Sequence, residues 1–441
     1  MNRQQILDNV DNLTAEQLFK FIRDGIINLS DLRNTGSLEA TKRIAIQEMQ
    51  RRLDNEDDDA WNKVITEADA NDYLQKFPAG RNKDKAISFI DKMKMQREVD
   101  IASRADKIRK IKSNDITPDV VQEYISQGNV DRYILKNECN LPDDIIDRIE
   151  KYRPIYGDDL LGPTPANIPK GFTEVYFWGI PNSGKTCALS TILNTANKKG
   201  YMQTGEGAGL KYMHVLKNLY RTDDNIGYLL ESSPDRTQYL PFTLKRDNEK
   251  YARSVSLIEL SGEVFDCFLK KNIGEDLGAL DGVFQTLNNY LTNENRKIHF
   301  FFIDYDPTSI ALDNYTQSDY LEEASKYFTK HKIFSKSTDS IYVVITKSDL
   351  IEGYGTDNKL LAQNINKYLD ENFKAFDNYL KKLCKDESIN GGEYDIIPFS
   401  IGTVYCKRIC KINRKPAEII INLLFDRIQT QKKSILDVFN K

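Results

Sequence analysis

The chain has 441 residues, of which 40% are apolar and 29% are charged, and its formal net charge is −4. This length predicts two or three domains, and the near-neutral charge gives no electrostatic sign of nucleic-acid binding. Six cysteines are scattered without a C-x-x-C pair, which favours a reducing compartment. The sequence has neither a signal-peptide core nor a run of roughly 18 apolar residues, so we expect a cytoplasmic protein without an integral membrane segment.

Residues 1–152 predict an all-α domain, because apolar residues recur three and four positions apart and glycines are few. The chain matches itself without a gap at an offset of 103 residues, which pairs Gly25 with Gly128. We therefore expect a duplicated helical module at about 15–52 and 118–152. Between the copies, three aromatic residues form either a peptide-binding cluster or ordinary core, and their helical spacing favours core: Trp61, Tyr73 and Phe77.

A linker is predicted at 153–170, where Arg153–Pro165 holds three prolines and two glycines. From 171 to 441 the pattern changes to strands that alternate with helices. We expect strands at 173–178, 238–245, 253–259, 297–303, 340–346 and 395–400, and helices at 185–197, 208–220, 279–292, 316–331, 358–384 and 416–430. The second and third strands should form an antiparallel hairpin within a mostly parallel six-stranded α/β sheet that carries helices on both faces.

The segment Gly179–Thr186 matches G-x-x-x-x-G-K-[ST] and lies between an expected strand and an expected helix. In this context the N–H groups of the loop and of the helix N-terminus surround phosphate oxygens. Lys185 would reach the terminal phosphates, and the Thr186 hydroxyl would ligate Mg²⁺. A glycine turn that caps an ordinary helix is the alternative. The expected nucleotide contacts here are Gly179, Asn182, Ser183, Gly184, Lys185, Thr186 and Cys187.

A second candidate segment is the apolar strand 253–259, which ends in Glu259 and is followed by Gly262. The carboxylate can hold Mg²⁺ through a water, and the Gly262 N–H can contact the γ-phosphate. Alone this pattern is weak, since a strand that ends in a surface turn has the same form.

The third segment is the apolar strand that ends in Thr346-Lys347-Ser348-Asp349. The Asp349 carboxylate can accept two N–H groups from the Watson–Crick edge of guanine, whereas adenine offers no matching donors, and the Lys347 stem can cover the base plane. A polar turn is the alternative. Ser400 and Ile401 end another strand, and their backbone would close over the base.

In order and character these segments resemble the P-loop GTPases of the translation-factor-related, Ras-like class, over roughly residues 171–430 and no part of the N-terminal third. The resemblance implies that Glu259–Gly262 is the switch-two D-x-x-G segment and that Thr346–Asp349 is the guanine motif. Two residues depart from the family pattern. Glu259 replaces an aspartate, and Glu263 stands where Ras-like proteins have a water-orienting glutamine.

The switch-one threonine is not fixed by a motif. Thr237 is the best candidate for a third metal ligand beside Thr186 and Glu259, and Thr222 and Thr204 are alternatives. Arg236 is either a cis arginine for the γ-phosphate or an ordinary loop residue.

The sequence thus predicts a GTP-binding protein that binds GTP with Mg²⁺ and slowly hydrolyses it to GDP and phosphate, with Lys185, Gly262 and Glu263 as catalytic residues. It would act as a switch for a protein partner bound through the helical domain, and a homodimer through the GTPase domain is a further option. Similar combinations occur in bacterial signalling and defence GTPases. The alternatives are a nucleotide-held scaffold without turnover, an ATPase, and a dynamin-type membrane-remodelling protein.

Overall fold

The computed structural model describes residues 1–33, 39–156, 165–205, 209–220, 226–230, 237–305, 315–334 and 337–428. They belong to two compact units, Met1–Arg109 and Lys110–Lys441. The division falls inside the long helix α6 (Lys83–Lys112), which begins in the first unit and ends in the second. Among the described residues, no helix combines the length and the apolar character that crossing a membrane requires.

The first unit is all-α, as expected. Before α6 its helices are α1 (Arg3–Leu7), α2 (Ala15–Arg23), α3 (Leu29–Arg33), α4 (Ala40–Trp61) and α5 (Glu67–Lys76). The helix α2 begins where the Thr14 side chain accepts from the Gln17 backbone and the Gln17 side chain accepts from Thr14 N, a reciprocal cap that satisfies two free donors. A small core joins α1 to α4.

The aromatic residues between the module copies form core, as their spacing favoured. The Tyr73 ring centroid lies 5.6 Å from that of Trp61 and 5.6 Å from that of Phe77. Tyr73 and Phe77 are buried, and the Tyr73 hydroxyl donates to the buried carboxylate of Asp57. These side chains therefore pack α4 against α5.

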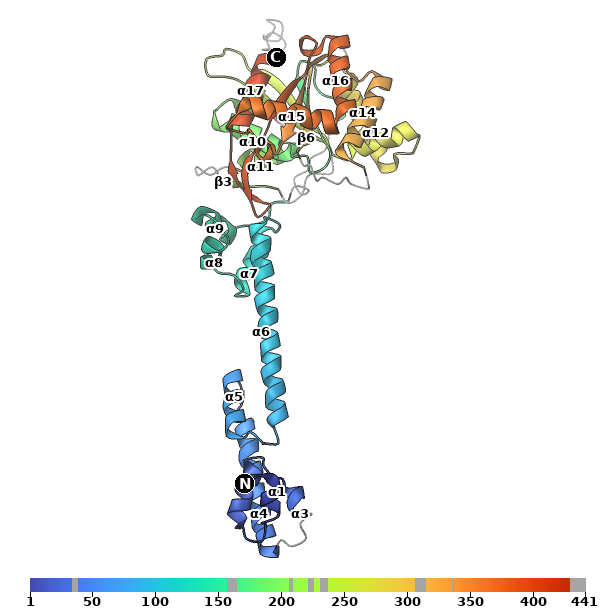
Figure 1. Cartoon of the computed structure of the whole chain (residues 1–441). Helices are drawn as coiled ribbons and strands as arrows, with labels where there is room; N and C mark the ends of the chain where they lie inside the picture. Colours follow the sequence, from blue (N-terminus) through green and yellow to red (C-terminus); the bar gives the residue numbers. More distant parts are fainter. Residues whose placement is uncertain are drawn as a thin grey trace. The chain divides into compact units, whose positions relative to one another are not determined.

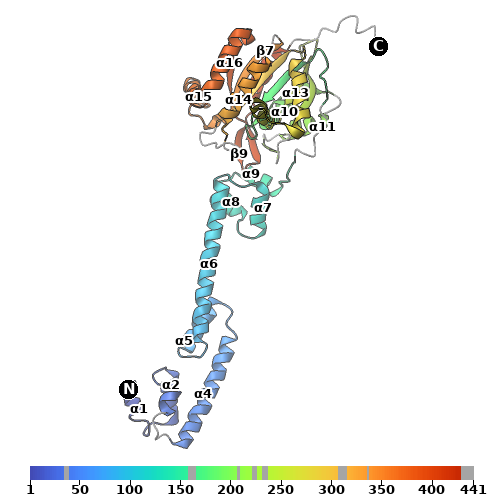
Figure 2. The ribbon, with the colours of Figure 1, turned by 90° about the vertical axis from the view of Figure 1, so that its right-hand side faces the viewer.

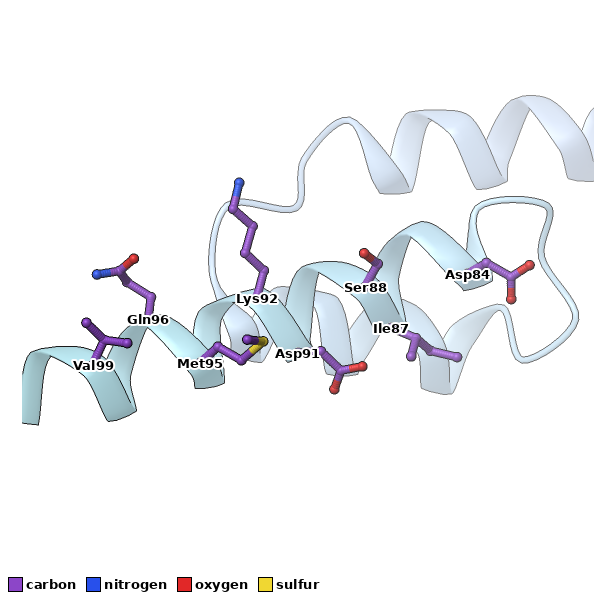
Figure 3. A pocket seen from close by; sticks show the side chains of 8 residues that line it. All are labelled: Asp84, Ile87, Ser88, Asp91, Lys92, Met95, Gln96 and Val99. Atoms are coloured by element: carbon purple, nitrogen blue, oxygen red, sulfur yellow. The ribbon is translucent and has the colours of Figure 1, made fainter. Parts of the chain in front are cut away.

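The helix α6 carries exposed apolar side chains within the first unit. Ile87, Met95 and Val99 lie along a shallow pocket on its surface, together with Asp91 and Lys92 (Figure 3). Met95 and Val99 keep 67% and 61% of their surface exposed. Large apolar side chains exposed in a row are a common mark of a contact surface.

The second unit begins with three helices that repeat the pattern of the first. They are α7 (Pro118–Ser126), α8 (Arg132–Asn137) and α9 (Asp143–Glu150), and their first residues lie 103 positions after those of α2, α3 and α4. The turns also correspond, since Gly25 has φ +70° and Gly128 has φ +71°, a conformation that suits glycine. In both copies the backbone N–H groups of the two residues after this glycine donate to a single carbonyl. It is the carbonyl of Phe21 in the first copy and of Tyr124 in the second.

The rest of the second unit is an α/β domain built on a seven-stranded sheet in the order β2-β4-β5-β1-β6-β7-β8. Its strands are β1 (Thr173–Trp178), β2 (Met202–Thr204), β4 (Gln238–Leu244), β5 (Arg253–Glu259), β6 (Lys297–Asp304), β7 (Thr338–Thr346) and β8 (Asp395–Pro398). The strands β4 and β5 pair antiparallel, whereas β5, β1, β6, β7 and β8 are parallel, which confirms the predicted topology. The sheet has seven strands rather than six because the short β2 pairs antiparallel with the edge of β4.

Helices cover both faces of this sheet, so its central strands are buried along their whole length. One face carries α12 (Val264–Ile273), α13 (Asp281–Thr292), α14 (Gln317–His331), α15 (Asn358–Asn372) and α16 (Lys374–Glu387). The other carries α10 (Lys185–Lys198), α11 (Leu210–Asn218) and α17 (Lys415–Arg427). Figure 1 shows α10, α11 and α17 on one side of the strands and α12 and α14 on the other. The helix expected over 358–384 is broken at Phe373, whose φ of −131° is not helical.

A second sheet of three strands, in the order β3-β10-β9, was not expected. Its strands are β3 (Ile226–Tyr228), β9 (Gly402–Tyr405) and β10 (Ile409–Ile412). It joins the segment after α11 to a hairpin that follows β8, and α9 lies close to β9 in Figure 2.

The helices α7 to α9 belong to the same compact unit as the α/β domain because they are bonded to this second sheet. Lys411 Nζ lies 2.8 Å from Asp144 Oδ2, and the ring of Tyr152 packs at 5.4 Å against the ring of Tyr228. The compact units therefore divide at 109/110, whereas the predicted linker is at 153–170, of which the structure describes only 153–156 and 165–170.

Candidate nucleotide-binding site

The phosphate loop lies between the central strand and a buried helix. The strand β1 ends at Trp178, α10 begins at Lys185, and the residues between them turn the chain. Because the N-cap residue is Gly184, no side chain caps α10, and the first N–H groups of the helix point into the loop. This is the geometry in which a helix N-terminus binds phosphate.

The Lys185 side chain is folded over this loop. Its Nζ donates to the Gly179 carbonyl at 2.5 Å and to the Ile180 carbonyl at 2.9 Å. Burial lowers the pKa of Lys185 to about 8, since an ammonium group loses hydration inside the protein. An anion in the loop would favour the charged form, so the loop is electrostatically suited to phosphate.

Two of the expected metal ligands lie in contact. The Thr186 hydroxyl donates to Glu259 Oε1 at 2.5 Å, and the Tyr212 hydroxyl donates to Glu259 Oε2 at 2.9 Å. Burial raises the pKa of Glu259. The hydrogen bond from Thr186 and the positive charge of nearby Lys185 oppose that rise. The longer side chain of glutamate thus reaches the first turn of α10.

The residue Gly262 packs directly on the phosphate loop. A Cβ atom at this position would lie 2.2 Å from Pro181 Cδ, so no other residue fits here without movement. Glu263 follows at the start of α12 with its side chain exposed, and its backbone N–H donates to Ser261 Oγ at 3.3 Å. The switch-two segment therefore lies against the loop, and Glu263 faces solvent.

Thr237 lies beside the end of β5 that carries Glu259. It is buried and precedes β4, whose first residue Gln238 pairs with Glu259. Thr204 instead lies in β2 and pairs with Phe242 of β4. Phe242 is four residues beyond Gln238, or about 13 Å along the strand. Thr222 and Arg236 lie outside the described residues.

The end of β7 is bonded to the phosphate loop. The Thr346 hydroxyl donates to the Ser183 carbonyl at 2.9 Å, which joins the two expected nucleotide motifs. The next residue, Lys347, has φ +53°, and its Nζ lies 2.7 Å from Asp304 Oδ2 at the end of β6. Its side chain is therefore held over this end of the sheet.

The residues expected at the base come from two neighbouring loops. Asp349 is exposed on the short 3₁₀ helix Ser348–Leu350. Buried Ser348 donates its N–H to the Phe399 carbonyl at 3.2 Å, and its hydroxyl accepts from Phe399 N at 3.0 Å. Ser400 is buried and Ile401 is half-buried directly beyond this link. The structure thus brings Asp349 and the 400–401 loop to the same end of the sheet.

A cavity of about 250 Å³ lies beside the loop. Its lining includes Thr186, Cys187 and Ser190 from α10, and Lys407 and Arg408 from the turn between β9 and β10. Sequence reasoning missed several residues that contact or line the site, among them Tyr212, Asp304, Lys407 and Arg408. Only Asp304 carried a usable sequence signal, since it ends the apolar run 298–303 as the other strand-end residues do.

No family model matches the chain, and no curated protein matches it. Among solved structures it is similar to the S. cerevisiae Ski7 GTPase-like domain, with 18% identity over 52% of this chain and 43% of that chain, at a TM-score of 0.27. It is also similar to Methanosarcina barkeri Roco2, with 14% identity over 62% of this chain and 55% of that chain, at a TM-score of 0.26. This chain therefore spans about half the length of both.

A further similar structure is a Plasmodium falciparum protein described as nucleolar GTP-binding protein 1. The identity is 14% over 59% of this chain and 89% of that chain, at a TM-score of 0.27. The chain's own features define the fold more directly. With the phosphate loop between β1 and α10 and the parallel strands β5-β1-β6-β7-β8, the domain has the α/β fold of a P-loop nucleotide-binding protein.

Proposed function

We propose that the α/β domain binds GTP and GDP with Mg²⁺ and slowly hydrolyses GTP. One observation carries this proposal, the hydrogen bond from Thr346 to the Ser183 carbonyl. The bond joins the first residue of the Thr-Lys-x-Asp segment to the phosphate loop, which supports one nucleotide site formed by both segments. A phosphate loop alone is compatible with any nucleotide, so the choice of guanine depends on Asp349.

The residues around Thr186 fit a magnesium ion. A hydroxyl and a carboxylate lie together at Thr186 and Glu259, and hard oxygen ligands of this kind suit Mg²⁺, which usually keeps phosphate and water oxygens as its other ligands. Thr237 would supply a further hydroxyl. Bound Mg²⁺ would neutralise developing charge on the phosphates, Lys185 would hold the β/γ oxygens, and the Gly262 N–H would contact the γ-phosphate.

Slow hydrolysis is the expectation for Glu263. Its side chain is exposed and, when ionised, accepts hydrogen bonds but cannot donate them, whereas a glutamine does both. A single-turnover comparison of the wild type with Glu263→Gln tests its role. A large fall in rate would identify Glu263 as a base toward the attacking water, and a gain would show that its charge slows the reaction.

Nucleotide affinities test the choice of base. In Asp349→Asn the side-chain acceptor becomes an amide, which donates, so GDP affinity should fall by roughly a hundredfold or more. The carbonyl at position 2 of xanthine matches that amide donor, so xanthosine diphosphate should bind this variant better than GDP. Asp370→Asn, an exposed change on α15, is the control and should leave GDP binding unchanged. Equal competition by ATP and GTP in the wild type would favour an ATPase instead.

A nucleotide-held scaffold is the second candidate, and the acidic character of Glu259 and Glu263 at the γ-phosphate end favours it. Such a protein would bind GTP tightly and release no phosphate over hours. A phosphate-release assay at saturating GTP separates it from a slow GTPase.

We propose that the helical N-terminal domain, residues 1–152, binds a protein partner, as in a switch protein of the signalling or defence kind. The exposed apolar side chains of α6 support this role. Met95→Glu should weaken partner binding without changing nucleotide affinity.

A homodimer through the GTPase domain is a separate proposal, which light scattering with GDP and with a GTP analogue would test.

A further inference from the structure

The turn between β9 and β10 is unusual in its backbone conformation. Cys406 and Lys407 have φ values of +47° and +55°, and Arg408 N donates to the Tyr405 carbonyl at 3.2 Å, which closes a tight hairpin turn. Residues other than glycine in this conformation cost free energy, and they persist where the surroundings enforce them. The turn is therefore held in place by its contacts.

One set of contacts holds the hairpin from the side of the helical module. Lys407 Nζ lies 2.7 Å from Asp115 Oδ1, and Lys407 N donates to Asn114 Oδ1 at 3.2 Å. Asn114 Nδ2 donates in turn to the Val404 carbonyl at 3.2 Å. Together with the ion pair between Lys411 and Asp144, these bonds fix the hairpin to residues 110–152.

A second set of contacts fixes the Arg408 side chain at the nucleotide-binding cavity. The Arg408 carbonyl accepts from Leu229 N at 2.8 Å, and its guanidinium donates to the Leu230 carbonyl. Arg408 lines the cavity with Cys187 and Ser190 of α10. Burial raises the pKa of the Cys187 thiol to about 11, and the positive charge of Arg408 is the strongest influence against that rise. The guanidinium is thus close to the first turn of α10.

Building on the proposed function, we propose that Arg408 is a nucleotide-binding residue that contacts a phosphate shared by GDP and GTP, and that residues 110–152 position it through the hairpin. The cavity that Arg408 lines includes the phosphate-loop residues Ser183, Gly184 and Lys185. It includes none of Glu259, Gly262 and Glu263, which the proposed function assigns to the metal and the γ-phosphate. A guanidinium forms short, charge-assisted hydrogen bonds with phosphate oxygens. The residue therefore acts on affinity for both nucleotides and does not act on the hydrolysis step.

The test measures GDP and non-hydrolysable GTP-analogue affinities on the full chain. In Arg408→Gln, which can still donate to the Leu230 carbonyl, both dissociation constants should rise about ten- to a hundredfold and by the same factor. Arg408→Lys should recover part of this loss, because it keeps the charge without the planar fork.

A second variant tests the positioning role from outside the cavity. Asp144→Asn removes the ion pair with Lys411 and should lower the affinities for GDP and the GTP analogue about threefold. In the Arg408→Gln background Asp144→Asn should cause no further loss of affinity, because both changes act through the Arg408 side chain. Lys326→Ala on α14 removes the ion pairs of Lys326 with Glu322 and Glu323 and is the matched control, which should change neither affinity. Thermal unfolding without nucleotide checks that each variant is folded.

The outcomes separate this proposal from the proposed function. If the wild type binds no guanine nucleotide, the proposed function itself fails. If the wild type binds and folded Arg408→Gln binds GDP equally well, Arg408 is not a nucleotide ligand. A loss confined to the GTP analogue would place Arg408 at the γ-phosphate and overturn the assignment to a shared phosphate. Additive losses in the double variant would overturn the positioning role of residues 110–152.

Discussion

The hydroxyl of Thr186 donates to Glu259 Oε1 over 2.5 Å, so the residue that follows the phosphate-loop lysine is bonded to the end of the neighbouring strand β5. The bond joins two segments that lie 73 residues apart in the chain. A cation bound between the two side chains would replace this hydrogen bond, with the Thr186 hydroxyl and the Glu259 carboxylate as its ligands.

The charge of Glu259 should set the magnesium requirement. Glu259→Gln keeps the length of the side chain and removes the charge, so the Mg²⁺ concentration for half-maximal GTP binding should rise about tenfold, because a neutral amide is a weaker ligand for a hard cation. A fluorescent-nucleotide titration at several Mg²⁺ concentrations measures it. Tyr212→Phe removes the 2.9 Å bond to the same carboxylate and is the control, with a smaller effect expected. An unchanged Mg²⁺ requirement in Glu259→Gln would exclude this role.

The close approach of Gly262 to Pro181 should make Gly262→Ala defective in hydrolysis. The added methyl group would lie 2.2 Å from Pro181 Cδ, so the switch-two backbone must move away from the phosphate loop. We expect the single-turnover rate to fall at least about tenfold while GDP affinity changes by less than about threefold, since GDP lacks the γ-phosphate. Gly282→Ala on α13, where a Cβ meets no atom within 4 Å, should leave both quantities unchanged. A normal rate in Gly262→Ala would show that the Gly262 amide is not used.

The bond from Thr346 to the phosphate loop should hold the loop in the conformation that binds the nucleotide. Thr346→Val removes the hydroxyl that donates to the Ser183 carbonyl at 2.9 Å, so affinity for GDP should fall about five- to tenfold, in line with the loss of one buried hydrogen bond. Thr338→Val lies at the other end of β7, where the hydroxyl is buried without a partner among the described residues, and it should leave affinity unchanged. Equal affinities in the two variants would contradict the coupling of the motifs.

The buried His299 should make folding sensitive to mild acid. Trp178 Nε1 donates to His299 Nδ1 at 3.0 Å, and burial, aided by Lys297, holds the pKa of His299 well below its usual range. The unfolded chain therefore binds more protons than the folded chain once the pH falls below about 6.5, and the free energy of unfolding decreases by up to about 1.4 kcal/mol per pH unit. Above that pH this contribution is constant.

Urea unfolding at pH 7.5 and pH 5.5 measures the effect. The chain has two tryptophans, so in a Trp61→Phe background the fluorescence reports on Trp178 beside His299. The decrease in unfolding free energy between the two pH values should be roughly 1 kcal/mol larger with His299 than with His299→Gln. Equal decreases would show that His299 is not responsible.

The parts of the fold that sequence could predict are those with a strong local pattern. The bounds of β1 and β5 agree with the prediction because apolar, strand-favouring residues fill the middle of each, and the phosphate loop follows from its own motif. The break at Phe373 was missed, since the apolar spacing of α15 continues into α16 and only the backbone turn at that residue divides them.

The second sheet was missed for a different reason. Its strands are only three or four residues long, and the pair Cys410 and Gly227 joins positions 183 residues apart, so no local pattern marks them. Arg408 could not be recognised as a candidate site residue for the same reason, because its place at the cavity depends on that pairing. The predicted role of Asp349 remains a prediction that Asp349→Asn addresses, and the roles of Ser400 and Thr237 also remain predictions.

The ion pairs between the second helical module and the small sheet have a practical consequence for expression. A fragment that starts at Gly171 would lack Asp115 and Asp144, the ion-pair partners of Lys407 and Lys411 respectively. It would also expose the ring of Tyr228 to solvent. A fragment that starts at Lys110 keeps every one of these partners. Shortening the protein to its α/β sheet alone should therefore yield a less soluble product than the longer fragment, although both carry the same phosphate loop.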